Sequence, residues 1–576
     1  MARVVRVLPD VPAIDKTFDY LVPETVEDQV RVGTMVRIAL HGRRVGGWVV
    51  ADDVEPPPGL ALKPLAKVTG WGPQPEVIEL ARWAAWRWAG RLASFLRTAS
   101  PERAVPHLPA SHPAGHPLPA VTDELVAEAL RAGRGVTVLR LPPATDLYPV
   151  ALAAAGTGHA LILVPGASSA RHLGLRLRRA GASVAVMPHE WARARDGATV
   201  VGTRAAAWAP VVDLSAVVVV DEHDESWQQE QAPTWHARDV AVERARRAGV
   251  PCVVVSPTPT LEAQAMGSVL RPSRATERAG WPVLDVVDRR GDDPARRSLF
   301  SERFVRVLPD TGRVVCVVNR KGRSRLLACA SCGAIATCER CRAAVVQDDS
   351  GELVCGQCGS RRPAVCLSCG AGAFRNLRAG VSRVREELEA LVREPVVDVT
   401  ASTAGRSLPD ARFFVGTEAV LHRIDTAVLV AFLDFDQELL APRYRAAEEA
   451  LSLLVLAARL VGGRGSGGRV LVQTRMPRHE VIEAALHGDP TRVSEAEAAR
   501  RRALGFPPVS AMAVVSGPSA PAFMEAFGQP LGVEILGPSD GRWLLRAPDH
   551  GPLLDALAAT PRPAGRLRIE VDPLRL

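Results

Sequence analysis

Eight of the ten cysteines in this chain lie between Cys329 and Cys369. They form four pairs with the spacing Cys-x-x-Cys: Cys329/Cys332, Cys338/Cys341, Cys355/Cys358 and Cys366/Cys369. Because this spacing lets two thiolates on one tight turn reach the same ion, four such pairs are typical of two closed four-cysteine zinc sites. A disulfide scaffold is the alternative, and it is disfavoured because nothing else in the chain is typical of a secreted protein.

The distances between the pairs along the chain predict which of them share an ion. Five residues separate Cys332 from Cys338, which leaves little room for these neighbouring pairs to face one metal. Thirteen residues separate Cys341 from Cys355, enough for a short hairpin. We therefore expect two Zn²⁺ ions in a nested arrangement: Cys329, Cys332, Cys366 and Cys369 form site 1, and Cys338, Cys341, Cys355 and Cys358 form site 2. Closed thiolate sites stabilise a module and leave no open position for catalysis.

The composition fits a multidomain protein with an anionic partner. The chain has 576 residues, more than a single hydrophobic core usually holds. It has no run of 18 apolar residues and no signal-peptide pattern, so we expect a cytoplasmic, nucleoid-associated protein with reduced thiols. The net charge of +8 favours nucleic acid as a partner. Only four of the 71 basic residues are lysines: Lys16, Lys63, Lys67 and Lys321.

The first 120 residues are predicted to form a small β domain, a helical stretch and a linker. Strand patterns occur at Arg3–Val7, Met35–Leu40 and Gly47–Val50, and residues 76–98 have helical periodicity. We assign residues 1–100 to one domain. Residues 101–120 contain six prolines and three histidines, which favours a linker over a metal site.

Two longer stretches, 121–310 and 311–507, alternate helices with apolar strands. Near-continuous apolar strands between helices indicate parallel sheets that are covered on both faces. The cysteine module, residues 329–369, interrupts the second stretch after its first strand and divides it into 311–328 and 370–507. Residues 508–576 have the pattern βαββαβ of a small split sandwich. The predicted fold class is therefore α/β and multidomain, with two parallel-sheet lobes, an inserted zinc module and a C-terminal α+β domain.

Several motifs extend this pattern to a known family. The sequence contains FDYLVP at 18–23, LKP at 62–64, GTRAA at 202–206, VVDEHD at 219–224, ARDVA at 237–241, SPTPTLE at 256–262 and VDP at 571–573. Together with the eight-cysteine pattern, they resemble the primosomal protein N′ (PriA) family of replication-restart proteins. The resemblance implies two RecA-like helicase lobes, the nested cysteine arrangement and an N-terminal domain that binds the 3′ end of a nascent DNA strand.

The resemblance also implies particular DNA-binding residues. The positions that match the family's 3′-end pocket are Phe18, Asp19, Gly42 and Lys63. An aromatic ring can stack on a terminal base, a carboxylate can accept from a 3′-hydroxyl, and a lysine can contact a phosphate. Phe18 could instead be a core residue, and Gly42 could be an ordinary turn glycine.

The chain departs from the family where ATP would bind. The family is an ATP-driven 3′–5′ DNA helicase whose phosphate-binding loop, or Walker A motif, requires glycines and a lysine. The matching stretch here is LPPATDLY at 141–148, with Ala144 in place of the lysine and Thr145 after it. No lysine lies between Lys67 and Lys321. We therefore identify the chain as a degenerate, actinobacterial-type member that lacks this motif.

Of the other parts of the ATP site, the acidic motif is kept and two segments are altered. After Gly416 and Thr417 the family continues with a KGHHF stretch, which is replaced here by VLHRI at 420–424. Asp221 and Glu222 keep an acidic motif, which we interpret as a relic. The family's QVAGRAGR segment is replaced by LAARLVGGR at 456–464, where Arg459 alone matches an arginine. ATP and Mg²⁺ are therefore not expected as cofactors. The family's winged-helix domain is also expected to be absent, because the linker at 101–120 stands in its place.

The leading hypothesis is a non-catalytic replication-restart protein. It would bind forked DNA with a nascent 3′ end and recruit primosome proteins, including factors that load the replicative helicase and single-strand binding protein. The alternative is an ATP-dependent 3′–5′ DNA helicase with an unconventional nucleotide site. A third hypothesis is a zinc-ribbon RNA-binding or transcription factor. Basic clusters at 43–44, 320–323 and 500–502 could contact DNA, although most charge runs are solvated surfaces.

Overall fold

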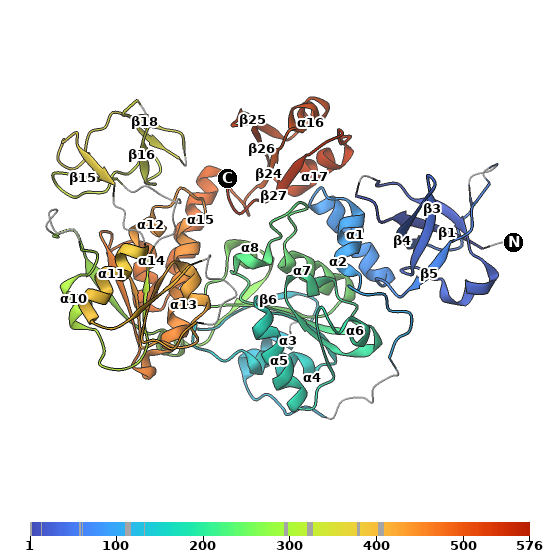
Figure 1. The fold of residues 1–576 in the computed structure, drawn as a ribbon, viewed down its shortest axis with the longest axis horizontal. Coiled ribbons are helices and arrows are strands. Elements are labelled where there is room, and N and C mark those ends of the chain that lie inside the picture. The colour runs from blue at the N-terminus through green and yellow to red at the C-terminus, as the bar shows by residue number, and fades with distance from the viewer. Residues whose placement is uncertain are drawn as a thin grey trace. The chain divides into compact units, whose positions relative to one another are not determined.

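The computed structural model describes the chain apart from residues 1–2, 13, 57–58, 60, 110–116, 132, 293–297, 319–326, 349, 357, 377–380 and 401–407. It divides into two compact units, whose elements are labelled in Figure 1. The first contains Met1–Leu139, Asp146–Arg271 and Arg501–Pro573, and the second contains Arg140–Thr145, Pro272–Arg500 and Leu574–Leu576. Among the described helices, none is long and apolar enough to cross a membrane.

A five-stranded antiparallel sheet begins the first unit, in the order β2-β1-β4-β3-β5. Its strands are β1 (Val4–Pro9), β2 (Phe18–Leu21), β3 (Met35–Leu40), β4 (Arg43–Ala51) and β5 (Lys67–Gly70). The segment before β5 also pairs with β2, because the Leu21 N–H donates to the Lys63 carbonyl at 3.0 Å. The sheet thus closes around alternating apolar side chains, which include Val5, Val7, Tyr20, Val36, Ile38, Val49 and Leu65.

The helical stretch that follows forms two helices, α1 (Pro75–Arg87) and α2 (Leu92–Ala99). Ala89 has a φ of 42°, a left-handed conformation that interrupts helical hydrogen bonding between them. The described residues between α2 and α3 (Glu124–Arg131) contain no helix or strand.

A seven-stranded sheet forms the next part of the first unit, in the order β12-β6-β11-β10-β7-β9-β8. Central strand β10 pairs in parallel with both β11 and β7, and its residues Val217–Val219 are fully buried. The predicted parallel sheet is therefore confirmed. The strands are β6 (Val136–Arg140), β7 (His159–Leu163), β8 (Val184–Val186), β9 (Thr199–Gly202), β10 (Leu214–Val220), β11 (Cys252–Ser256) and β12 (Ser268–Leu270).

Helices cover both faces of this sheet. Helices α3, α4 and α5 contact one another in sequence, whereas α6 and α7 share a buried core with α1 and α2. The remaining bounds are α4 (Tyr148–Gly156), α5 (Ala167–Arg179), α6 (Trp191–Gly197), α7 (Ala237–Ala248) and α8 (Leu261–Met266). Short 3₁₀ helices lie at Glu24–Gln29, Arg204–Trp208, Glu225–Trp227, Glu418–His422 and Arg464–Ser466.

The C-terminal part of the first unit has the predicted βαββαβ order. Its elements are β24 (Ala511–Ser516), α16 (Ala520–Phe527), β25 (Glu534–Ser539), β26 (Arg542–Ala547), α17 (His550–Ala559) and β27 (Arg568–Val571). The strands form an antiparallel sheet in the order β25-β26-β24-β27. Side chains of α1 fix this domain, since Trp86 Nε1 donates to Asp555 at 2.8 Å and Arg87 pairs with Asp572 at 2.6 Å.

The second unit is built on a six-stranded sheet with the order β13-β23-β22-β14-β21-β20. Its strands are β13 (Val283–Asp288), β14 (Val314–Val317), β20 (Val396–Val399), β21 (Phe413–Gly416), β22 (Leu429–Phe432) and β23 (Arg469–Thr474). The boundary predicted from the sequence for this lobe is residue 311. The sheet begins earlier, because β13 pairs in parallel with β23 along its whole length.

Helices cover both faces of this sheet too. Helices α10 and α11 share a buried core with one face, and α13 and α14 share a core with the other. The helices of this part are α9 (Arg274–Ala279), α10 (Glu302–Arg306), α11 (Val381–Val392), α12 (Asp436–Leu439), α13 (Ala446–Val461), α14 (Glu480–His487) and α15 (Thr491–Leu504).

The cysteine module follows β14, the second strand of this sheet along the chain. It consists of two antiparallel ribbons around a small core. In one ribbon β15 (Leu327–Cys329) pairs with β19 (Phe374–Asn376). In the other, β16 (Val345–Gln347) and β18 (Arg361–Arg362) flank β17 (Leu353–Cys355).

Candidate functional sites

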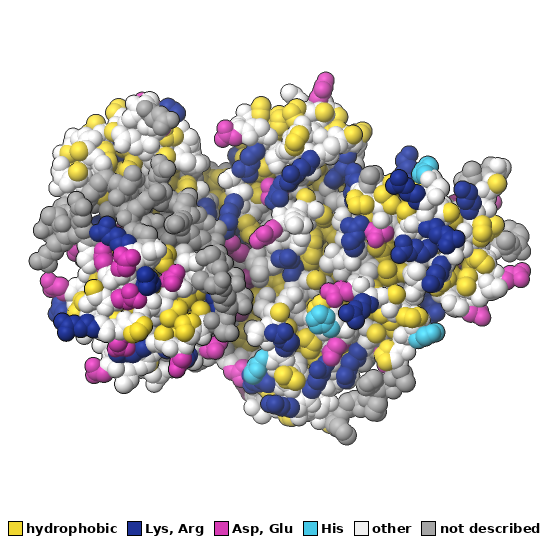
Figure 2. Space-filling model, in the orientation of Figure 1, with side chains coloured by type: hydrophobic (Ala, Val, Ile, Leu, Met, Phe, Trp, Pro, Cys, Tyr) yellow, Lys and Arg dark blue, Asp and Glu magenta, His cyan; other side chains and the backbone are white. Residues whose placement is uncertain are grey.

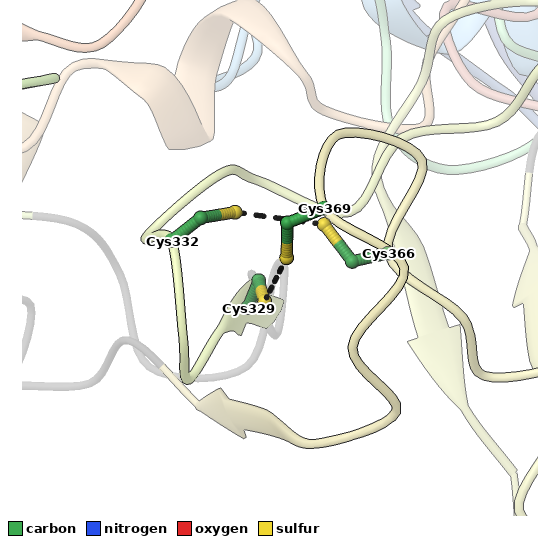
Figure 3. A group of neighbouring side chains, drawn as sticks. All are labelled: Cys329, Cys332, Cys366 and Cys369. Carbon is green, nitrogen blue, oxygen red and sulfur yellow. Dashed lines mark hydrogen bonds between the residues drawn. The ribbon is translucent and has the colours of Figure 1, made fainter.

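The eight clustered cysteines form two groups of four. In the first group, Cys329 Sγ lies 3.5 Å from Cys369 Sγ, and Cys332 Sγ lies 3.6 Å from Cys366 Sγ (Figure 3). The second group contains Cys338, Cys341, Cys355 and Cys358, with sulfur–sulfur distances of 3.5 and 3.4 Å. This is the nested grouping that the spacing predicted, with the outer pairs in one cluster and the inner pairs in the other.

Each Cys-x-x-Cys pair lies on its own tight turn. The four turns have the same conformation, which we call a cysteine knuckle. The residue after the second cysteine has a positive φ and donates its N–H to the carbonyl of the first cysteine at 2.9–3.0 Å. Three of these residues are glycines, Gly333, Gly359 and Gly370, with φ between 70° and 76°. The fourth is Arg342, with a φ of 65°. The turns aim each pair of sulfurs inward from opposite sides of the cluster.

The electrostatics of the first cluster favour a bound cation. Backbone N–H groups of Cys332 and Ser331 lower the pKa of Cys329 to about 6. The Ala371 N–H favours the Cys369 thiolate as well, but the neighbouring Cys332 and Cys329 sulfurs raise the pKa of Cys369 to about 12. Burial opposes the Cys366 thiolate, but the Ser368 and Cys369 N–H groups outweigh burial and lower the pKa of Cys366. Two thiolates are therefore favoured and that of Cys369 is opposed by its neighbours, so full ionisation of the group needs a positive ion.

This donor set fits zinc. Four thiolates at these separations can reach one ion at about 2.3 Å in a closed tetrahedral site. The structure therefore contains two four-cysteine clusters that suggest two zinc sites.

The module contacts the rest of the second unit at Ala344. The Ala344 N–H donates to the Leu440 carbonyl at 3.1 Å, and both residues are buried together with flanking Met476. On the surface of the module, the apolar side chains that flank Cys366 are exposed: Val365 is 46% exposed and Leu367 is 57% exposed.

Residues 140–144, at the start of the segment expected to match the phosphate-binding loop, contact other residues of the second unit. Arg140 pairs with Glu277 at 2.7 Å, and both side chains are less than a tenth exposed. Arg140 also donates to Thr491 at 2.8 Å. Four residues later, the Ala144 N–H points to the Gly280 carbonyl at 3.4 Å.

Glycines of the second unit lie directly against the same segment. A Cβ added to Gly280 would stand 2.3 Å from Pro142, and one added to Gly463 would stand 3.6 Å from Ala144. Arg459, the residue that matched an arginine of the family's ATP site, approaches the Pro143 carbonyl with its Nε at 3.4 Å. Protein atoms therefore surround this segment on the side of Gly280 and Gly463.

The acidic motif after β10 is held by neighbouring side chains. Asp221 has a φ of 53°, and its carbonyl accepts from Trp227 Nε1 at 2.8 Å. The Glu222 side chain is fully buried. It accepts from Arg238 at 3.1 Å, from the Thr260 N–H at 2.6 Å and from the Thr260 hydroxyl at 2.9 Å. Sequence reasoning could not find these partners, because they lie 16 and 38 residues away.

The first two predicted DNA-binding residues lie on β2. Phe18 is half-buried and packs against the enclosed core of the N-terminal sheet. Asp19 lies opposite Arg6 on β1, and the two form a two-pronged ion pair at 2.8 and 3.1 Å. Arg6 was not predicted, and its cross-strand position opposite Asp19 is the signal that identifies it.

The other two lie in loops. Gly42, with a φ of 77°, and His41, with a φ of 46°, form the two-residue turn between β3 and β4. This geometry favours glycine for the backbone alone. Lys63 is exposed, and its carbonyl accepts from Leu21 at the end of β2. The structure thus brings Lys63 to the strand that contains Phe18 and Asp19.

The remaining basic clusters differ in exposure. Arg501 is fully buried and pairs with Glu262 at 2.9 Å, so the run at 500–502 is not a continuous solvated surface. Arg43 and Arg44 are exposed on β4. The cluster at 320–323 lies outside the described residues.

Comparisons with known proteins agree on one family. The sequence profile of the PriA 3′ DNA-binding domain (3′BD) matches residues 6–101. The probable replication restart protein PriA of Mycobacterium tuberculosis (strain CDC 1551 / Oshkosh) is 30% identical, and the match covers 92% of this chain and 90% of that protein. The replication restart protein PriA of Bacillus subtilis (strain 168) is 29% identical over 62% of this chain and 49% of its own length.

Two solved structures also align with part of the chain. Dbp5 of S. cerevisiae has a TM-score of 0.37 and 11% identity, and the alignment covers 66% of this chain and 93% of Dbp5. A DEAD box protein from Methanococcus jannaschii has a TM-score of 0.32 and 11% identity over 66% of this chain and 90% of its own. The near full-length match to the mycobacterial relative shows that this chain belongs to the PriA family of replication restart proteins.

Proposed function

We propose that this protein binds abandoned or stalled replication forks and recruits primosome components without hydrolysing ATP. Family membership and the 3′ DNA-binding domain at 6–101 support the fork as the DNA substrate. The observation that carries the proposal is the contrast between the two kinds of site. The cysteine clusters are complete, whereas the segment at 141–145 is held by contacts of the chain itself.

The loss of ATP hydrolysis follows from the chemistry of that segment. A phosphate-binding loop needs free backbone N–H groups and a lysine that reaches the β- and γ-phosphates. Pro142 and Pro143 have no N–H, and Ala144 supplies no charge and directs its N–H to Gly280. The buried Glu222 carboxylate already accepts three hydrogen bonds, from Arg238 and Thr260, so the protein itself takes most of its acceptor sites.

The cysteine module serves as a platform for protein partners in this proposal. Two zinc ions would stabilise it, with Cys329, Cys332, Cys366 and Cys369 at one ion and Cys338, Cys341, Cys355 and Cys358 at the other. Exposed apolar side chains at Val365 and Leu367 support a protein rather than a nucleic-acid contact there. The expected partners are proteins that load the replicative helicase, together with single-strand binding protein.

The fork assignment is tested by fluorescence anisotropy with four labelled DNAs. These are a fork with a 3′ end at the junction, the same fork with that end blocked, a plain duplex and a single strand. We expect the open-ended fork to bind most tightly and binding to weaken steeply with salt. Equal affinity for all four would contradict the proposal and favour a general zinc-ribbon nucleic-acid binder.

A further inference from the structure

The outer face of the N-terminal sheet contains a group of cations on three adjacent strands. Along β3, Val36 and Ile38 point into the enclosed core, so Arg37 and Ala39 point outward. The same alternation places Arg44 of β4 outward, because Val45 packs against the enclosed core. Lys67 of β5 points outward, since its neighbour Val68 packs against that core.

The strand register brings these three cations together. Arg37 lies directly opposite Lys67 on β5, and Arg44 lies opposite Ala39, two residues along from Arg37. Positive side chains directly opposite each other destabilise a sheet. A protein that keeps them at neighbouring positions gains stability when an anion binds between them.

None of the three is neutralised within the described part of the chain. Arg37, Arg44 and Lys67 are exposed and form no ion pair with a described residue. Two other arginines of this domain are paired: Arg3 with Asp52 at 2.5 Å and Arg6 with Asp19 at 2.8 Å.

One carboxylate, Asp10, lies beside this group. The Asp10 Cβ lies 3.8 Å from the position that a Cβ added to Gly46 would take, and Gly46 is the residue opposite Arg37. Asp10 is paired with Arg97 of α2, so its charge is already compensated. Figure 2 shows dark-blue side chains gathered over the N-terminal domain, with few acidic ones among them.

The residues between the cations have small side chains or none. Gly46 stands opposite Arg37 and Ala39 stands opposite Arg44, so no large side chain separates the three charges. An extended sugar-phosphate backbone can therefore lie close to the sheet. The group is also continuous with the 3′-end residues, because the segment from Lys63 to Lys67 runs from β2 to β3, where the Ala66 N–H donates to the Arg37 carbonyl at 2.9 Å.

We propose that Arg37, Arg44 and Lys67 form a phosphate track that holds the backbone of the DNA strand whose 3′ end the domain binds. The inference rests on the proposed function, which supplies the DNA, and adds the path that the strand follows across β5, β3 and β4. Phosphate contacts position the strand without reading its sequence. Removal of each contact therefore weakens binding to every DNA sequence alike and makes the salt dependence shallower.

The test uses the full chain and the glutamine variants Arg37→Gln, Arg44→Gln and Lys67→Gln, alone and combined. Affinity for the open-ended fork is measured by anisotropy across a range of salt concentrations. We expect the slope of log K against log salt to become shallower by about one for each substitution. The triple variant should show the same loss with the 3′ end blocked, because the track acts on phosphates and not on the terminus.

Arg82→Gln is the matched control, because Arg82 is exposed on α1 and pairs with Glu79. It removes the same charge outside the track and should leave the slope unchanged. A triple variant that binds forks with the wild-type slope would overturn the track while leaving the proposed function intact. A wild-type protein that does not bind forks would overturn the proposed function itself.

Discussion

At the scale of single residues, Arg342 stands where the other three cysteine knuckles have glycine. Its φ of 65° lies in the left-handed region, which costs a residue with a side chain about 1 kcal/mol. Its N–H still donates to the Cys338 carbonyl at 3.0 Å, so the turn itself is complete.

Arg342→Gly should therefore stabilise the module. The gain is expected to be about 0.5 kcal/mol, because the added freedom of glycine in the unfolded chain offsets part of the relieved strain. Slower loss of zinc to a competing coloured chelator would show it.

Gly333→Ala is the reverse substitution at an equivalent turn position, where the φ is 72°, and serves as the control. It should destabilise the module by about 1 kcal/mol and speed the loss of zinc. If both variants shift the rate in the same direction, backbone conformation is not the cause.

A second residue-scale prediction concerns Asp572. Burial alone would raise its pKa, but the charges of Arg87 and His550 outweigh burial and hold the pKa well below its usual value near 4. A depressed carboxylate pKa stabilises the fold above the unfolded-state value, and this stabilisation is lost as pH falls through the folded-state value.

Asp572→Asn keeps a residue that tolerates the φ of 47° at this position while removing the charge. We expect a loss of about 2 kcal/mol at pH 7, less than for a fully buried pair because Asp572 is partly exposed. The urea midpoints of wild type and variant should differ clearly above about pH 5, and the difference should shrink progressively as pH falls below about 4 toward the folded-state pKa. A difference that persists unchanged at pH 3 would show that the charge is not responsible.

At the scale of elements, we expect the cysteine module to need the two proposed zinc ions for its fold and the sheet around it to fold without them. The module's core contains small residues such as Ala336 and Ala343 and only a few larger ones such as Leu327 and Leu353. So small a hydrophobic core does not stabilise a fold without an additional cross-link such as a bound metal ion. In contrast, β14 is buried between β21 and β22.

Removal of zinc with a chelator under reducing conditions should therefore unfold the module alone. Hydrogen exchange should become fast in β15 through β18 while β14 and β22 remain protected. Protection that survives full removal of the metal in β16 and β17 would contradict this account.

Local patterns in the sequence predicted the elements whose partners are close along the chain. The cysteine grouping follows from short spacings, and the C-terminal βαββαβ order follows from alternating strand and helix patterns. The membership of β13 in the second sheet was not predictable, because its partner β23 begins at Arg469. The Arg6–Asp19 pair and the enclosure of Glu222 likewise depend on which strands and loops become neighbours in space.

At the scale of the whole molecule, the chain combines a net charge of +8 with a 3′ DNA-binding domain, two complete four-cysteine clusters and, as we propose, an altered nucleotide site. In an ATP-driven helicase the phosphate-binding loop, the acidic pair and the arginines each contribute large factors in rate. Here the acidic pair is kept, whereas the loop segment 141–148 and the arginine segment 456–464 differ from the family's motifs. We interpret these two differences as those of a protein that works by binding and assembly. We therefore infer that this protein recognises forks without ATP turnover.

Phosphate release from ATP in the presence of Mg²⁺ tests this claim most directly. It should be measured with the open-ended fork at a concentration that anisotropy shows to be saturating. We predict that the bound protein releases no more phosphate than the same sample without DNA, and that Asp221→Ala does not change the rate. Fork-stimulated phosphate release that disappears in Asp221→Ala would contradict the account and establish an ATP-dependent helicase with an unconventional nucleotide site.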